Sequence, residues 1–247
     1  MVYEPRTYRE VVDAAGLVSF EVVRAETDLH ISASRDLAQE ATTLVQQLRG
    51  DLEGYIATHP RFAESFVPVE VEADAPEVVR AMAAAARSAE VGPMAAVAGA
   101  VAERVARGLS VLSPEVIVEN GGDLYLMGRV PRRVLLEAGD SPLSARVALD
   151  ILAEDLPVAV CTSSGRVGHS VSLGVAHAVT VLADEGAFAD AVATAVGNLV
   201  HGLDDVEAAV AHGHAMPGVR GVVVISGERI GAAGQIHLVR VGACAPP

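Results

Sequence analysis

Hydrophobic and polar residues alternate along residues 17–31, which is the pattern of strands that bury one face. The polar run at residues 26–28 interrupts the alternation and predicts the bend of a β-hairpin. From Ser34, which we interpret as an N-cap, apolar residues recur every three or four positions up to Ile56. This spacing predicts a helix that ends at His59-Pro60.

Two helices rich in small residues are expected next. Asp74 and Glu77 have the spacing of a capping box, which predicts a helix from this point through Ala89. Gly92-Pro93 ends that helix, and a second one is predicted over residues 94–109. Because Ala and Gly leave little bulk on any helix face, we expect both helices to pack closely in a buried layer.

The second half of the chain begins with short apolar runs that predict strands. These runs are residues 116–118, 124–127, 134–137, 147–152, 158–161 and 178–182. A helix is predicted from Asp184 to Val200 and another after Asp204, and two further strands, 219–225 and 236–241, flank a Gly-rich loop. Strands and helices in blocks favour layered α+β architecture. We find no linker and no repeat, so we expect residues 1–247 to form a single domain, either one compact unit or a two-lobed one.

Composition and charge exclude several classes of protein. A hydrophobic content of 51% with 20% charged residues is too apolar for a disordered chain. All 18 basic residues are Arg, so Schiff-base and P-loop lysines are absent. The net charge of −14 opposes binding to nucleic acid. The sequence has no export signal and no apolar run long enough to cross a membrane, so we expect a cytoplasmic protein with no membrane partner.

The segment Glu119-Asn120-Gly121-Gly122-Asp123 lies between two predicted strands. Asn-Gly is a strong signal for a hairpin turn, since both positions tolerate positive φ. The second glycine and the two flanking acids exceed what a turn requires. Consecutive glycines allow backbone amides to approach a ligand closely, and the acids can hold a hydroxyl or a metal. Both the turn and the ligand site remain open interpretations.

A loop rich in hydroxyl groups follows the strand at residues 158–161. It contains Thr162, Ser163, Ser164 and Gly165 and continues to His169. Loop amides and hydroxyls are suited to binding phosphate. A second interpretation makes Cys161 or Ser163 a nucleophile with His169, but the sequence has no G-x-S-x-G elbow.

On the helix predicted after Asp184, Asp190 and Thr194 are four residues apart and share one face. A carboxylate and a hydroxyl in a stripe of Ala and Val form an oxygen pair suited to Mg²⁺. Alternatively, the Thr194 hydroxyl bonds to the backbone of its own helix.

In this order, E-N-G-G-D, T-S-S-G, A-V-T-V and A-D-A-V-A-T-A resemble the ApbE superfamily of FAD:protein FMN transferases. The chain is most similar to an uncharacterised bacterial and archaeal branch marked by V-G-P-M-A-A-V-A-G, V-E-N-G-G-D and C-T-S-S-G-x-x-G-H-S. The resemblance extends from about Tyr8 to Asn198. It implies an ApbE-like α+β fold, related to the T-fold, with FAD across a cleft.

The resemblance also implies Mg²⁺ and FAD as cofactors, a protein acceptor for FMN, and specific residue roles. Asp190 and Thr194 would hold the metal, and His169 would act as a general acid or base. The implied flavin or adenylate site is formed by Asn120, Gly121, Gly122, Asp123, Thr162, Ser163, Ser164 and Gly165. With no Trp in the chain, a flavin ring would have to stack on Tyr125, Phe188 or an aliphatic side chain such as that of Met94.

Three hypotheses follow from these features. The first is a Mg²⁺-dependent enzyme that transfers FMN from FAD to protein or cleaves the FAD pyrophosphate. The second is a non-catalytic module that binds a flavin or a pterin, which is favoured by the absence of the family's D-P-x-T-G stretch. The third is a homo-oligomer in which the small-residue helices form the seam between subunits.

Overall fold

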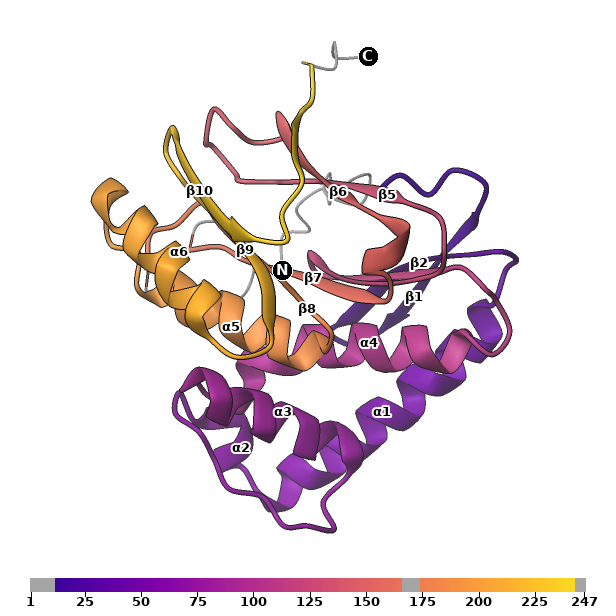
Figure 1. The fold of residues 1–247 in the computed structure, drawn as a ribbon. Coiled ribbons are helices and arrows are strands. Elements are labelled where there is room, and N and C mark those ends of the chain that lie inside the picture. The colour runs from indigo at the N-terminus through magenta and orange to yellow at the C-terminus, as the bar shows by residue number, and fades with distance from the viewer. Residues whose placement is uncertain (1–11, 166–173, 243–247) are drawn as a thin grey trace.

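The computed structural model describes residues 12–165 and 174–242, and its largest element is an antiparallel sheet with helices along one face (Figure 1). Eight strands form this sheet in the order β1-β2-β3-β4-β7-β8-β9-β10. They are β1 (Val18–Arg24), β2 (Thr27–Ala33), β3 (Val116–Asn120), β4 (Asp123–Met127), β7 (Val158–Ser163), β8 (Ala178–Ala183), β9 (Val219–Ser226) and β10 (Arg229–Gly234). The predicted α+β class is therefore confirmed.

A small sheet lies on the other face of the large one, opposite the helices (Figure 1). Its strands are ordered β11-β6-β5 and comprise β5 (Arg132–Leu135), β6 (Val147–Ile151) and β11 (Leu238–Arg240). The helices are α1 (Ala38–Thr58), α2 (Arg61–Glu64), α3 (Glu77–Ala89), α4 (Val97–Leu109), α5 (Gly186–Asn198) and α6 (Val206–Ala215). Among the described residues, no helix is both long and apolar enough to span a bilayer.

The two halves of the large sheet repeat one topology, although the sequence shows no repeat. In the first half β1 and β2 are followed by α1 to α4 and then by β3 and β4. In the second half β7 and β8 are followed by α5 and α6 and then by β9 and β10. The halves meet where β4 pairs with β7 through three residue pairs, Leu124↔Val160, Tyr125↔Ala159 and Leu126↔Val158.

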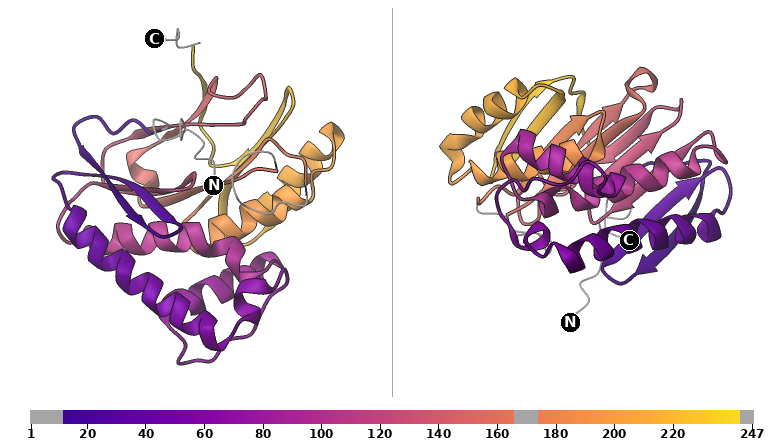
Figure 2. Two further views of the ribbon diagram at one scale, coloured as in Figure 1. Left: turned by 180° about the vertical axis from the view of Figure 1, so that it is seen from behind. Right: turned by 90° about the horizontal axis from the view of Figure 1, so that it is seen from below.

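The large sheet is buried on both faces at its centre. One core lies between this sheet and the helices, and the other lies between the two sheets. Every residue of β8 is buried, which explains why its sequence is apolar apart from Thr180 and does not alternate. The helices lie across the sheet in the right-hand view of Figure 2, and α3 packs on α1, α4 and α5, so the expected buried helical layer is present.

The tightest helix contact joins α4 to α5 at Gly99 and Gly186. A Cβ atom built on Gly99 would lie 2.2 Å from the carbonyl oxygen of Gly186, and one built on Gly186 would lie 2.2 Å from the carbonyl oxygen of Gly99. The buried Glu103 of α4 accepts a hydrogen bond from the Gly186 amide at 2.7 Å. This carboxylate satisfies an amide at the start of α5 that has no partner within its own helix.

Two predicted helix caps were wrong. Helix α1 begins at Ala38, and Ser34 instead bonds through its amide and its hydroxyl to Ser113. Helix α3 begins at Glu77 with Pro76 at the cap position and no side-chain cap from Asp74. In both cases the local sequence resembles a cap, but the side chain does not cap the helix. For Ser34 the reason is its bond to Ser113, a partner distant in the sequence.

The hairpin bend and the last loop also differ from the prediction. Arg24 pairs with Thr27, so the bend lies at residues 25–26, before the predicted position. The Gly-rich segment after β9 contains the strand β10, which the sequence did not predict. Its residue Gly231 lies close to α6, where a Cβ atom would come within 3.0 Å of the Val206 and Val210 side chains.

We predict that Gly99→Ala lowers the free energy of unfolding by about 1–3 kcal/mol, because the methyl group would overlap the Gly186 backbone. Gly50→Ala is the matched control, since its Cβ on α1 would meet no atom within 4 Å. The control should raise stability by about 0.5–1 kcal/mol. Urea unfolding followed by circular dichroism measures both, and equal stability of the two variants would contradict the tight helix crossing.

Candidate functional site

The side chain of Asp190 projects from α5 toward the start of α4. Its Oδ2 atom accepts a hydrogen bond from the Gly99 amide at 3.0 Å, and the neighbouring Ala98 amide also favours the charged form of this carboxyl group. These amides belong to the first turn of α4, where backbone donors lack partners within the helix and the helix dipole favours negative charge. Asp190 therefore caps a helix 91 residues away along the chain while remaining partly exposed.

Asp123, at the start of β4, lies against Asp190. Asp123 is 5% exposed, accepts a hydrogen bond from the Thr162 amide at 2.9 Å, and shares a side-chain hydrogen bond with Asp190. Burial, and then the charge of Asp190, raise the pKa of Asp123 well above its ordinary value. Burial raises the pKa of Asp190 to about 7, although the Gly99 and Ala98 amides oppose the shift. The two carboxyl groups therefore hold a proton between them near neutral pH.

The turn between β3 and β4 lies at the same end of α4. Gly121 and Gly122 are its two central residues, with φ of 65° and 102°, as a two-residue hairpin turn of type I′ requires. The Asn120 side-chain amide donates to the carbonyl oxygen of Ala98 at 3.1 Å, which ties the hairpin to α4. The structure thus brings Asn120, Asp123 and Asp190 together around the first turn of this helix.

The predicted hydroxyl residues lie along the end of β7. The Thr162 hydroxyl bonds to the Thr180 hydroxyl at 2.9 Å, while the Thr162 amide bonds to Asp123. Ser163 is buried and Ser164 is partly exposed. The amide of Gly165 donates to the carbonyl oxygen of Ala176, and a Cβ at Gly165 would lie 2.2 Å from the Gly174 carbonyl oxygen. His169 lies outside the described residues.

Thr194 lies one turn beyond Asp190 on the same helix face and is also partly exposed. The donor set at this face consists of hard oxygen atoms, which are the ligands that Mg²⁺ prefers. Within residues 12–165 and 174–242, no group of three or more His, Cys, Asp or Glu side chains is arranged to hold a metal ion. Oxygen atoms of this kind are compatible with the predicted Mg²⁺ ion, and the assignment of Asp190 and Thr194 as its ligands stays a prediction.

Two interpretations from the sequence are corrected by burial. Cys161 is fully buried and its thiol lies 3.6 Å from the carbonyl oxygen of Gly186, and burial raises the pKa of this thiol well above its ordinary value. A thiol in this environment is not a nucleophile. Tyr125 is fully buried beneath Arg107, so it presents no ring face to a flavin.

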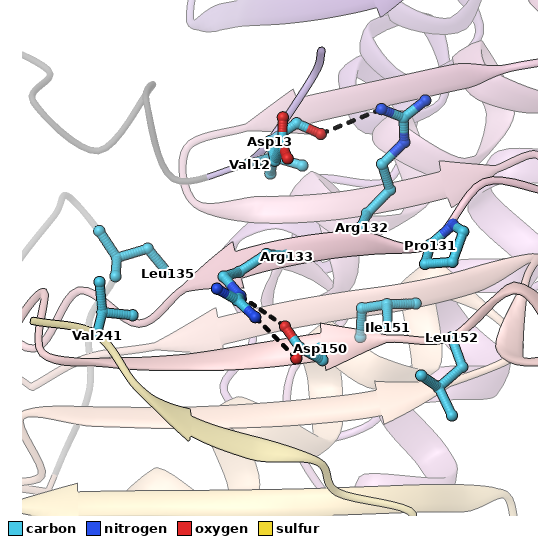
Figure 3. A pocket seen from close by; sticks show the side chains of 10 residues that line it. All are labelled: Val12, Asp13, Pro131, Arg132, Arg133, Leu135, Asp150, Ile151, Leu152 and Val241. Carbon is cyan, nitrogen blue, oxygen red and sulfur yellow. Dashed lines mark hydrogen bonds and ion pairs between the residues drawn. The ribbon is translucent and has the colours of Figure 1, made fainter.

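The structure also shows a hollow that is separate from these residues (Figure 3). Its volume is about 550 Å³, and it lies on the small sheet, where Arg133 forms a two-hydrogen-bond ion pair with Asp150. Residues lining it include Leu135, Leu152 and Val241, and none of the predicted site residues. It therefore does not contribute to the candidate site.

Sequence reasoning did not find the meeting of Asp123 with Asp190 or the role of Glu103. The signal for Glu103 was present, because Glu103 and Arg107 have the i, i+4 spacing of a helical ion pair and their side chains lie 2.7 Å apart. The carboxyl pair had no such signal, because its members come from a strand and a helix far apart in the sequence.

Comparison with known proteins shows matches over most of the chain. A family described as AbpE bacteria matches residues 9–232. The UPF0280 protein MK0206 of Methanopyrus kandleri is 42% identical over 227 residues, which cover 89% of this chain and 91% of that protein. The UPF0280 protein MJ1526 of Methanocaldococcus jannaschii is 41% identical over 203 residues, with coverage of 80% and 82%.

The solved structures that resemble this chain share its fold at low sequence identity. The flavin transferase ApbE from Vibrio cholerae has a TM-score of 0.61 and 15% identity, and the match covers 88% of this chain and 96% of that one. The flavinyl transferase ApbE of Pseudomonas stutzeri, in its apo form, has a TM-score of 0.56 and 16% identity, with coverage of 88% and 94%. The expected ApbE-like fold is confirmed.

We predict that the stability of the metal-free protein falls as pH rises from about 4 to about 7. Within this range folded Asp190, with its pKa raised to about 7, retains a proton that the unfolded chain has lost, so rising pH favours unfolding. Because each pKa unit is worth about 1.4 kcal/mol, the loss should be on the order of 4 kcal/mol. Urea unfolding in EDTA at several pH values measures it.

The double variant Asp123→Asn/Asp190→Asn should lack this pH dependence, because each amide keeps an oxygen acceptor but cannot ionise. Asp51→Asn on the exposed side of α1 should retain it. A double variant with the wild-type pH dependence would contradict the shared proton.

Proposed function

The chain belongs to the family described as AbpE bacteria and is related to the archaeal UPF0280 proteins, and we propose that it is a Mg²⁺-dependent enzyme acting on FAD. In the proposed reaction the FAD pyrophosphate bond breaks, AMP leaves, and the FMN phosphate is transferred to a hydroxyl group of a protein acceptor or to water. The names of the structural neighbours, a flavin transferase and a flavinyl transferase, support this choice of substrate.

The observation that carries the proposal is the meeting of three elements around the start of α4. Asp190 and Thr194 present oxygen atoms on one face of α5, while Asn120 holds the Gly121-Gly122 turn against the same helix end. Oxygen ligands for a cation beside a turn of bare backbone suit a ligand that has both phosphates and a ring system.

The proposed roles combine the contacts of Asp190 and Asp123 with the family resemblance at Thr194 and His169. Asp190 and Thr194 would hold the metal, and Asp190 would bind it in its deprotonated form. The Gly99 amide orients the Asp190 carboxylate, and Asp123 holds Asp190 from the other side. When bound, Mg²⁺ neutralises negative charge on the pyrophosphate. His169 is the proposed general acid or base, which deprotonates the acceptor hydroxyl or protonates the leaving phosphate.

We predict that purified protein incubated with FAD and Mg²⁺ releases AMP and forms FMN or a flavin-bound protein, and that EDTA prevents both. Asp190→Asn should reduce turnover by at least about 100-fold, since even outer-shell partners of a metal are worth about 10–100-fold. Thr194→Val should also reduce turnover, because valine retains the shape and removes the ligand oxygen. Mass spectrometry of products and intact protein gives the measurement.

Thr43→Val is the matched control, because Thr43 is an exposed helical threonine on α1. Its turnover should equal that of the wild type. Recovery of intact FAD bound to the wild-type protein, with no product, would indicate a flavin-binding module and not an enzyme. An absence of FAD binding would refute the proposed function.

A further inference from the structure

Glu119 contacts the glycine turn from the side that faces away from the helices. Its side chain lies on the same face of β3 as Ile117, is 2% exposed, and lines a small cavity with Ile117 and Leu124. One carboxylate oxygen, Oε1, accepts a hydrogen bond from the Gly122 amide at 2.7 Å. A bond this short from a backbone amide to a buried carboxylate is among the stronger hydrogen bonds in a protein.

The turn needs such support because it consists of two glycines. Glycine loses more conformational freedom on folding than any other residue, so Gly121-Gly122 is the least preorganised sequence for this turn. Asn-Gly would form the same type I′ turn with less freedom to lose. The hydrogen bond from the Gly122 amide to the buried Glu119 therefore restrains a turn whose glycine sequence leaves it flexible.

Packing against the protein does not require glycine at either position. A Cβ built on Gly121 or on Gly122 would meet no described heavy atom within 4 Å. The space in front of the turn is therefore open, while Glu119 holds its back. A turn with bare backbone toward open space and a fixed rear surface is suited to contact with a flat or charged ligand.

We propose that Glu119 is a positioning residue, which fixes the Gly121-Gly122 turn so that its bare backbone contacts the nucleotide. This inference rests on the proposed function for its ligand. Glu119 acts through the Gly122 amide and does not itself touch the ligand, since its side chain is buried on the far side of the turn.

The first test is Gly121→Asn, which restores a strong turn sequence and places a side chain in the open space. We expect the variant to be at least as stable as the wild type and to bind FAD at least tenfold more weakly in the presence of Mg²⁺. Fluorescence titration of FAD measures the affinity. Wild-type affinity in this variant would overturn contact between the turn and the nucleotide.

The second test compares Glu119→Ala with Glu119→Gln. Alanine removes the acceptor of the Gly122 amide, whereas glutamine retains an oxygen at the same position. We expect Glu119→Ala to bind FAD about tenfold more weakly and to lose protection of the Gly122 amide against hydrogen exchange, measured by NMR. Glu119→Gln should stay within about twofold of the wild type in FAD affinity and keep that amide protected.

Ser32→Ala is the matched control. Ser32 is buried on β2, lines the same small cavity as Glu119, and its hydroxyl bonds to Ser19 at 2.8 Å, so the variant removes a nearby buried hydrogen bond but leaves the acceptor of the Gly122 amide in place. It should keep wild-type FAD affinity and Gly122 protection. An equal loss in this control would make the effect at Glu119 one of general stability and overturn the positioning role.

Other outcomes also separate the two proposals. If wild type binds FAD and Glu119→Ala binds it equally well, the role of Glu119 is refuted and the proposed function stands. If Glu119→Gln loses as much affinity as Glu119→Ala while its Gly122 amide remains protected, the charge of Glu119 acts on the ligand directly and positioning is refuted. If the wild type does not bind FAD, both proposals fail.

Discussion

The backbones of α4 and α5 touch at Gly99 and Gly186, and the rest of the structure depends on this contact. Neither position has room for a Cβ atom, so the two helices cross at the closest approach that the chain allows. Each helix also caps the other: Glu103 of α4 accepts from the first amide of α5, and Asp190 of α5 accepts from Gly99 in the first turn of α4. The crossing thus fixes where the two acidic side chains lie and which donors they face.

The crossing explains why a site with buried carboxyl groups forms in a core of Ala and Val. A buried carboxylate is costly unless it is hydrogen-bonded, and the amides at helix starts supply those bonds. Glu103 has the Gly186 amide and Arg107 as partners. Asp190 has amides and also a second carboxyl group, Asp123, and burial of this pair raises the pKa of Asp190. Glu103 stabilises the fold, whereas Asp190 retains a titratable proton at a partly exposed position.

Features that depend on neighbouring residues along the chain were predicted well from the sequence. The helix end at Ala89, the strand that begins at Val147 and the glycine turn all follow from local spacing, and the structure agrees. Prediction from the sequence failed where a contact with a residue distant in the chain determines the local structure. Ser34 bonds to Ser113 and so does not cap a helix. Strand β10 pairs with β9 along its whole length, although its Gly- and Ala-rich sequence has little β-propensity. The Asp123 contact with Asp190 depends on the α4–α5 crossing, which local patterns do not reveal.

The repeated topology places the candidate site at the seam between β4 and β7, where the two halves of the large sheet meet. This seam joins the two halves of the large sheet through only three residue pairs among the described strands. Asp123 belongs to one half and Asp190 to the other, and Gly99 and Gly186 are divided in the same way. A molecule bound between the turn and α5 would therefore contact both halves of the sheet, beside the α4–α5 crossing that already joins them.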